Sequence, residues 1–355
     1  MRNERWRRWG VAVLRILAVA VAYYVTGRIG LLQRVEIDGA VVTPLFLPTG
    51  IALSGLLRLG LGVWPGIALG SYLVIETING FQPSGLAILA GNTLAPVCAA
   101  LLLRRVGFRP ALDRLGDGVA LVFLGGMVPM LISATVGSVV VLLSGSLPGD
   151  GFWSFWAAWW AGDAMGVLVL TPLLLVLRRP YGLSRDPLRW AEAVALAVGV
   201  VLVSLFVTRS SIALLFLVFP LLIWAALRFR LPGAAPCVLL VSVLAISAAN
   251  DRVGPFAGQS LLEVMVNLQA LNGSVALTGL LLSAMVTEQQ NVREKIEQAC
   301  LDMAELVERL VPGRPVDTWP PPDRDGPRGS GTAGDRSAGE RSAGDRPAGD
   351  RPVGD

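Results

Sequence analysis

The chain has 355 residues, of which 54% are hydrophobic and only 16% are charged, and its mean hydropathy is +0.62. A soluble domain usually carries about a quarter charged residues, so a water-soluble fold could not hide this much apolar surface. The net charge of +4 comes almost entirely from arginine, because Lys295 is the only lysine. In a membrane protein arginines report topology first, and no nucleic-acid partner is expected.

Histidine is absent from the sequence. This excludes a histidine phosphoacceptor, a histidine general base and a His-ligated metal in this chain. The cysteines Cys98, Cys237 and Cys300 are widely separated, and we expect them to act as small hydrophobic residues. Glycine-rich phosphate loops, HExxH motifs and nucleophile elbows are also missing. We therefore predict no enzyme activity, no catalytic residues, no metal and no cofactor.

Apolar runs of about 17 to 25 residues predict an all-α, polytopic transmembrane bundle. Only Leu57-Arg58-Leu59-Gly60 separates the second run from the third, so eight, nine or ten spans remain open. The first run is long enough to span and has no small-residue cleavage site, so it is interpreted as a retained helix rather than a signal peptide. The ten expected helices cover residues 10–32, 42–58, 61–78, 83–104, 117–145, 152–177, 188–208, 211–229, 232–250 and 261–286.

The distribution of arginine predicts the orientation, because short cytoplasmic loops hold more arginine than external loops. With the N-terminus inside, only Arg28, Arg34, Arg209 and Arg252 fall in external positions. We therefore expect a multi-pass protein of the cell membrane, in contact with lipid, with both termini cytoplasmic. Fifteen arginines then fall inside: Arg2, Arg5, Arg7, Arg8, Arg58, Arg104, Arg105, Arg109, Arg114, Arg178, Arg179, Arg185, Arg189, Arg228 and Arg230.

Asp163 is the most unusual polar residue of the apolar runs. It lies about eleven residues into the tryptophan-rich run that begins at Phe152. A charge at mid-depth costs on the order of 2.5–3.5 kcal/mol on insertion scales, so Asp163 is expected to face the bundle interior. It would either contact a ligand or ion, or make a structural hydrogen bond to a partner such as Asn92. The candidate cavity residues are Asp163, Trp160, Trp159, Asn92, Trp64 and Asn272.

Four prolines, Pro48, Pro65, Pro172 and Pro220, are expected to interrupt apolar helices. Interrupted helices free backbone groups, and transporters use them to build midplane sites. Proline kinks are also frequent in helical bundles without transport activity. Gly162 and Gly166 have the spacing that lets two helices approach closely, which indicates packing.

The sequence changes character after residue 286. Residues 287–311 are predicted to form an amphipathic or coiled-coil helix, because six apolar residues repeat at alternating spacings of four and three. Two copies would pair in parallel through residues 288–310; alternatively, a lone helix would lie on the membrane or against the bundle. Residues 312–355 form a low-complexity repeat with little apolar content, for which we expect disorder. The repeating residues are Val292, Ile296, Ala299, Met303, Leu306 and Leu310.

Several of these stretches, in this order, resemble the MASE1 integral membrane sensory domain of bacteria. They are Pro48 to Ala52, Trp64 to Gly70, Trp156 to Asp163, and Phe219 to Phe229. The resemblance implies a sensory input domain over residues 10–286. Such domains are usually joined through a helix to histidine kinase, diguanylate cyclase or phosphodiesterase domains.

This sequence shows the connecting helix but no segment that resembles those outputs. We therefore expect a stand-alone sensor that detects an unidentified signal and relays it through the 287–311 helix to a separate signalling protein. The alternative is a small-molecule permease or a substrate-binding component of a transport system, which the interrupted helices favour.

Overall fold

The structure, a computed structural model, describes residues 2–32, 35–37, 40–80, 82–177, 187–210 and 214–310. It divides into two units, Met1–Ala299 and Cys300–Asp355. The predicted disordered tail, 312–355, lies outside the described residues, and that expectation stays a prediction. Of the second unit, the described residues are helical.

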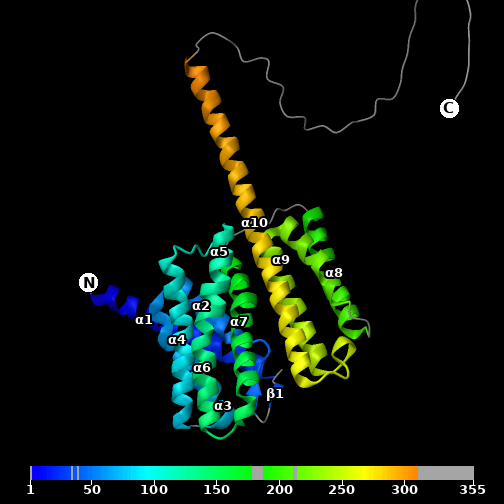
Figure 1. Cartoon of the computed structure of the whole chain (residues 1–355). Coiled ribbons are helices and arrows are strands. Elements are labelled where there is room, and N and C mark those ends of the chain that lie inside the picture. Colours follow the sequence, from blue (N-terminus) through cyan, green and yellow to red (C-terminus); the bar gives the residue numbers. More distant parts are fainter. Residues whose placement is uncertain are drawn as a thin grey trace, which may run out of the picture. The chain divides into compact units, whose positions relative to one another are not determined.

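The described part of the chain is all-α apart from one short antiparallel hairpin, which confirms the predicted fold class (Figure 1). Short 3-10 turns precede α3, α7, α9 and α10, and a π-helical segment, Leu121–Met127, joins α5 to α6. The elements are α1 (Arg2–Leu31), β1 (Val35–Ile37), β2 (Ala40–Val42), α2 (Leu47–Leu59), α3 (Trp64–Asn79), α4 (Pro83–Arg105), α5 (Leu115–Ala120), α6 (Val128–Leu143), α7 (Phe152–Val176), α8 (Pro187–Arg209), α9 (Val218–Asn250) and α10 (Leu261–Leu310).

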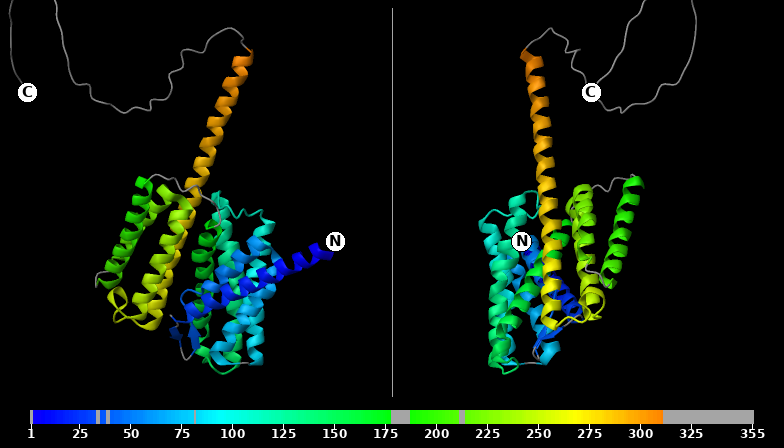
Figure 2. Two further views of the ribbon diagram at one scale, coloured as in Figure 1. Left: turned by 180° about the vertical axis from the view of Figure 1, so that it is seen from behind. Right: turned by 45° about the vertical axis from the view of Figure 1, so that its right-hand side comes forward.

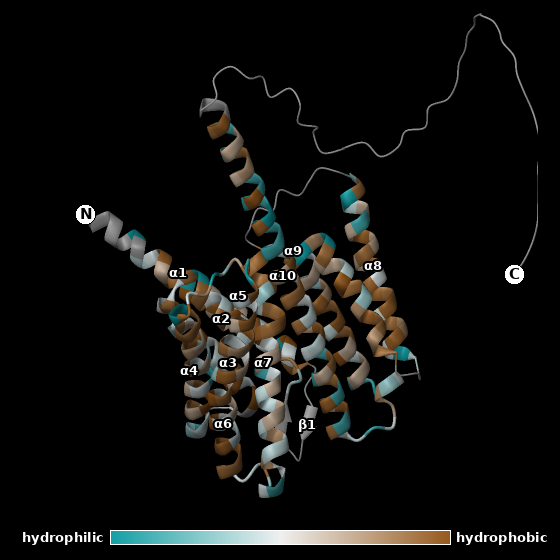
Figure 3. Ribbon diagram, turned by 45° about the horizontal axis from the view of Figure 1, so that its top comes forward, coloured by the Kyte–Doolittle hydropathy of each residue, from teal (hydrophilic) through white to brown (hydrophobic). Residues whose placement is uncertain are grey.

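Eight helical stretches of the described residues are long and apolar enough to cross a membrane. Hydrophobic residues predominate along α8 and α9, whereas hydrophilic residues are frequent in the later part of α10 (Figure 3). Large apolar side chains such as Leu202 and Phe206 are exposed, as expected for lipid contact. The stretches are Trp9–Leu31, Leu61–Ile78, Pro83–Arg105, Leu115–Leu143, Gly149–Val176, Pro187–Arg209, Leu215–Asn250 and Leu262–Val307.

The second expected span, 42–58, is not a full transmembrane helix. Its helix, α2, begins only at Leu47 and has 13 residues. At 1.5 Å per residue it is about 20 Å long, less than the roughly 30 Å of a hydrocarbon core. Pro48 lies in the first turn of α2 and Pro65 in the first turn of α3, where a missing N–H costs nothing. These two prolines therefore start helices rather than interrupt them.

The other two prolines also lie within helices. Pro172 is inside α7, which runs without a break from Phe152 to Val176, and Pro220 belongs to the first turn of α9. The break in α9 falls instead at Arg230, which has non-helical angles of φ 55° and ψ −149°. The expected helices 211–229 and 232–250 are thus the two halves of one apolar stretch.

The two halves of α9 fold back on each other. A Cβ atom added to Gly233 would lie 3.2 Å from the carbonyl oxygen of Ala225, eight residues earlier. Eight residues of straight helix would separate these positions by about 12 Å, so the chain reverses between them. Arg228, near the end of the first half, pairs with Glu192 near the start of α8 at 2.6 Å. The first half of α9 is therefore antiparallel to α8.

Most residues of helix α7 are buried within the first unit. It packs against α2, α6 and α9, while α1 packs on α2 and α3, and α4 packs on α6 (Figures 1 and 2). The contact with α2 is close because neither helix carries a side chain at the crossing. A Cβ on Gly50 would overlap the carbonyl oxygen of Gly166, and one on Gly166 would overlap that of Phe46. The helix packing expected from this glycine pair is confirmed at Gly166, whereas Gly162 approaches the non-helical backbone of Thr43.

Candidate ligand cavity

An extended segment, Thr43–Phe46, lies against α7 inside the bundle. The Phe46 N–H donates to the carbonyl oxygen of Gly162 at 3.0 Å. The Thr49 hydroxyl contacts two carbonyl oxygens, those of Phe46 at 2.7 Å and Asp163 at 2.9 Å. Non-helical backbone is tolerated in a membrane protein where the protein itself satisfies its polar groups. The glycine at 162 makes this approach possible, because a Cβ there would overlap the Thr43 carbonyl oxygen.

Asp163 is the centre of the buried polar groups, with only 1% of its surface exposed. The Ser133 hydroxyl of α6 donates a hydrogen bond to Asp163 Oδ2, and the Trp159 indole also interacts with the carboxylate. Ser133 thus takes the structural role that was suggested for Asn92. The Asn92 side chain donates instead to the Ser71 hydroxyl of α3, at 3.3 Å. No basic side chain of the described residues forms an ion pair with Asp163.

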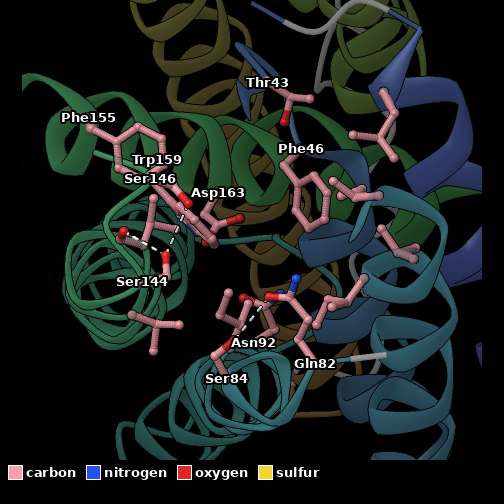
Figure 4. A pocket seen from close by; sticks show the side chains of 17 residues that line it. Thr43, Phe46, Gln82, Ser84, Asn92, Ser144, Ser146, Phe155, Trp159 and Asp163 are labelled. Atoms are coloured by element: carbon pink, nitrogen blue, oxygen red, sulfur yellow. Dashed lines mark hydrogen bonds between the residues drawn. The ribbon is translucent and has the colours of Figure 1, made fainter. Parts of the chain in front are cut away.

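A cavity of about 340 Å³ opens beside this carboxylate (Figure 4). Asp163 and Asn92 lie well inside their helices and form its deep end, whereas Gln82, Ser84 and Ser144 lie near helix ends and form its rim. Most of the wall between them is apolar or aromatic. The lining residues are Leu31, Thr43, Phe46, Val74, Ile75, Ile78, Gln82, Ser84, Ile88, Asn92, Val140, Val141, Ser144, Ser146, Phe155, Trp159 and Asp163.

The cavity includes Asp163, Trp159 and Asn92 of the six residues expected to line one. The Trp160 indole instead donates to the Met127 carbonyl oxygen at 2.7 Å and stacks on Trp156. Its position is explained by this hydrogen bond to the last residue of the π-helical segment.

The remaining two expected residues lie elsewhere. Trp64 is 52% exposed at the start of α3. Asn272 of α10 is fully buried without a hydrogen bond to its side chain, but it does not line the cavity.

Several residues of the site were not found from the sequence, among them Ser133, Ser71, Thr43 and Phe46. Tyr23 of α1 also belongs to this region. Its hydroxyl is fully buried, interacts with Ser71 and Asp163, and lacks a hydrogen bond of standard geometry. Serine and threonine are common in membrane helices, where they bond their own backbone, so their presence alone gave no signal. Phe46 and Thr43 were assigned to a helix that starts only at Leu47.

The extended segment also contacts α10. The Gln269 side-chain amide donates to the Pro44 carbonyl oxygen at 2.9 Å. Pro44 lies between two cavity-lining residues, Thr43 and Phe46. One face of this segment therefore borders the cavity, and another is bonded to the helix that leaves the apolar part of the chain.

The groups of the cavity are of the kinds that bind small molecules. A carboxylate, an amide, hydroxyls and aromatic rings converge there. Among the described residues, no three His, Cys, Asp or Glu side chains are grouped as a metal site would require.

Comparison with known proteins gives two matches. The MASE1 family model matches residues 15–290. The chain is also 30% identical over 223 residues to "Probable diguanylate cyclase DgcE" of Escherichia coli (strain K12), an alignment that covers 59% of this chain and 19% of that protein. The chain thus spans about a fifth of the length of this relative. No solved structure matches. A MASE1 membrane domain is what these comparisons find in the chain.

Proposed function

The chain belongs to the MASE1 family, and from that membership and the cavity we propose that it is a membrane sensor whose bundle binds a small molecule and relays its presence through α10 to a separate partner. The observation that carries the proposal is the position of Thr43–Phe46. This segment borders the cavity through Thr43 and Phe46 and is bonded to α10 through Pro44. A ligand that displaces the segment therefore acts on α10 directly.

A second contact ties α10 to the opposite end of the bundle. The Glu288 carboxylate accepts a hydrogen bond from the Leu115 N–H, at the start of α5, at 2.8 Å. Nearby, a Cβ on Gly118 would lie 3.2 Å from the Leu281 side chain. Helix α10 is thus held at Gln269 beside the cavity and at Glu288 beside α5. A signal requires two arrangements of these contacts that the ligand binds unequally, because equal affinity shifts no population.

Beyond Glu288, α10 offers an apolar stripe to a partner. In the first unit Val292 and Ile296 are 50% and 59% exposed, and in the second Met303 and Leu306 are 66% and 56% exposed. Their heptad spacing favours a parallel pair of α10 helices from two copies. The relayed signal would then reach a separate signalling protein as a change in this pair.

The arginines support a cytoplasmic position for both termini and an extracytoplasmic mouth for the cavity. Arg104 of α4 donates to the Leu56 carbonyl oxygen of α2 at 3.2 Å, which brings the ends of these helices together. Arg105, Arg109 and Arg114 follow at the same end, whereas the cavity rim lies at the other end of α4. Cytoplasmic loops are rich in arginine, so this distribution favours a rim that faces outward.

A test of the sensor proposal does not need the natural ligand. In protein with Cys98, Cys237 and Cys300 replaced by alanine, Ser84→Cys places one thiol on the cavity rim, and benzyl methanethiosulfonate fills the cavity covalently. Hydrogen exchange of residues 288–310 in nanodiscs is expected to change on modification. Asp150→Cys, an exposed position outside the cavity, is the control and should give no change. Unchanged exchange in α10 with the cavity filled would contradict relay.

The second candidate is a small-molecule permease. Extended backbone beside a buried carboxylate is an arrangement that transporters use at their binding sites, and Thr43–Phe46 with Asp163 has this form. Flux through the protein in liposomes separates the two functions, because a pure sensor moves no solute.

A further inference from the structure

We propose that the cavity binds a small organic monocation, with its ammonium group at Asp163 and its apolar body against Phe46, Phe155 and Trp159. This inference names the ligand class of the cavity described above and rests on the proposed function only in taking that cavity as the sensory site. It follows from the charge, aromatic content and size of the lining.

The only charge in the described lining is negative. Among the seventeen lining residues that the structure describes, Asp163 is the only ionisable side chain, and none is lysine or arginine. A carboxylate or phosphate ligand would find no positive partner there and would face Asp163. An amino acid would satisfy its ammonium group but leave its own carboxylate uncompensated, and a buried unpaired charge is strongly unfavourable. Among charged ligands, cations are therefore favoured.

The Asp163 carboxylate retains capacity to bind such a cation. A carboxylate has about four lone-pair sites for hydrogen bonds. The Ser133 hydroxyl donates to it and the Trp159 indole interacts with it, and no further side-chain donor to its carboxylate is found among the described residues. The Ser133 hydrogen bond also orients the carboxylate, so an ammonium group meets an acceptor that is already oriented.

The aromatic residues give the cavity its preference for an organic cation over a simple ion. Phe155 and Trp159 meet edge to face with ring centroids 5.7 Å apart, and both line the cavity. Ammonium groups are attracted to the faces of aromatic rings, and the rings and aliphatic walls bury the apolar part of the ligand. Gly137 makes room for this arrangement, because a Cβ there would come within 2.6 Å of the Trp159 ring.

The size of the cavity limits the ligand further. About 340 Å³ is at the lower end of the range for small-molecule sites, so a peptide would not fit. A divalent metal ion is also disfavoured, because calcium takes six to eight oxygen ligands, usually from several carboxylates. The described lining supplies a single carboxylate, that of Asp163.

The test measures binding of three matched probes to the full chain in nanodiscs by calorimetry. The probes are 2-phenylethylammonium, the neutral 2-phenylethanol and the anionic 3-phenylpropionate. We expect saturable binding of the ammonium probe, at least tenfold tighter than the alcohol, and no binding of the carboxylate. Equal binding of alcohol and ammonium, or no ammonium binding at all, would overturn the assignment.

Two variants locate the site. Asp163→Asn should weaken ammonium binding at least tenfold and leave the alcohol unaffected, whereas Asp150→Asn, which removes an exposed carboxylate outside the cavity, should change neither. Because Asp163→Asn can disturb folding, a second arm keeps Asp163 and blocks the cavity at Ser84→Cys with the benzyl reagent. Ammonium binding that survives this block contradicts the site. Asp163-dependent binding of sodium without binding of the ammonium probe also contradicts it.

The outcome is separable from that of the sensor proposal. Ammonium binding that depends on Asp163 but leaves exchange in α10 unchanged supports the ligand class and contradicts the relay. A response of α10 to covalent filling of the cavity, without ammonium binding, supports the relay and contradicts the ligand class.

Discussion

Gln269 of α10 donates its side-chain amide hydrogen to the carbonyl oxygen of Pro44, at 2.9 Å. The two residues are 225 positions apart in the chain, and the bond joins the wall of the cavity to the helix that carries the signal in our proposal. An unpaired buried carbonyl costs about 1–3 kcal/mol, so the bond favours one position of the segment relative to α10.

Replacement of Gln269 by leucine should uncouple the cavity from α10. The variant keeps the side-chain volume and loses the hydrogen bond, so covalent filling of the cavity should change exchange in residues 288–310 by less than half of the normal amount. Asn267→Leu is the matched control, because Asn267 lies exposed on the same helix and bonds to Gln259 instead of the segment. An undiminished response in Gln269→Leu would show that this contact does not carry the signal.

Alanine at Gly166 should destabilise the bundle. Its Cβ would overlap the backbone carbonyl of Phe46, which cannot turn away as a side chain can. Overpacking of this kind costs typically 1–3 kcal/mol. Thermal unfolding in detergent should therefore show a lower midpoint for Gly166→Ala. At Gly273 the added atom would meet only the flexible end of Met165, at 3.6 Å, so Gly273→Ala should unfold near the normal temperature.

Substitutions at the adjacent residues Trp159 and Trp160 should have different effects, one on ligand affinity and the other on stability. Trp160→Phe removes the hydrogen bond to the Met127 carbonyl, so we expect a loss of about 0.5–1.5 kcal/mol in stability and unchanged affinity for the phenylethylammonium probe. Trp159→Phe removes the indole that interacts with Asp163 and part of the cavity wall, so it should weaken probe binding. Equal effects of the two variants on affinity would argue against the described cavity.

Glycine at position 230 should stabilise the turn within α9. Arg230 has φ 55° and ψ −149°, a conformation that is favourable essentially only for glycine. Both Arg230→Gly and Arg230→Ala remove the charge, so a difference between the two variants reports the effect of the Cβ atom. We expect the glycine variant to be more stable by about 1–2 kcal/mol. The midpoint of thermal unfolding measures the difference, and equal midpoints would contradict strain at this position.

The proposed α10 pair predicts position-specific cross-linking. In protein without other cysteines, Ala299→Cys lies on the apolar seam, so two copies should form a disulfide on mild oxidation. Glu294→Cys is exposed and lies on the opposite side of the heptad, so it should remain monomeric under the same conditions. Gel electrophoresis without reductant measures both. Equal cross-linking at the two positions would indicate random collision rather than a coiled coil.

Much of the fold followed from local composition. The apolar runs located the helices of the bundle, and Gly162 and Gly166 marked a close approach that the structure confirms. The boundaries were less certain where prolines lay near helix starts. The sequence alone does not distinguish a proline that interrupts a helix from one in its first turn. The two cases differ only in whether the backbone before Pro48 or Pro65 is already α-helical, and the structure shows that it is not.

By itself, the sequence determined that this is a multi-pass helical membrane protein and that Asp163 is its most anomalous buried residue, since both conclusions depend on the transfer of side chains from water to lipid. Only the tertiary structure decided what surrounds that residue. It brought Ser133 rather than Asn92 to the carboxylate, and it placed Thr43–Phe46 between the cavity and α10. The physical reason is that a hydroxyl or backbone group can be satisfied by many partners, and the spatial approach of distant segments selects one.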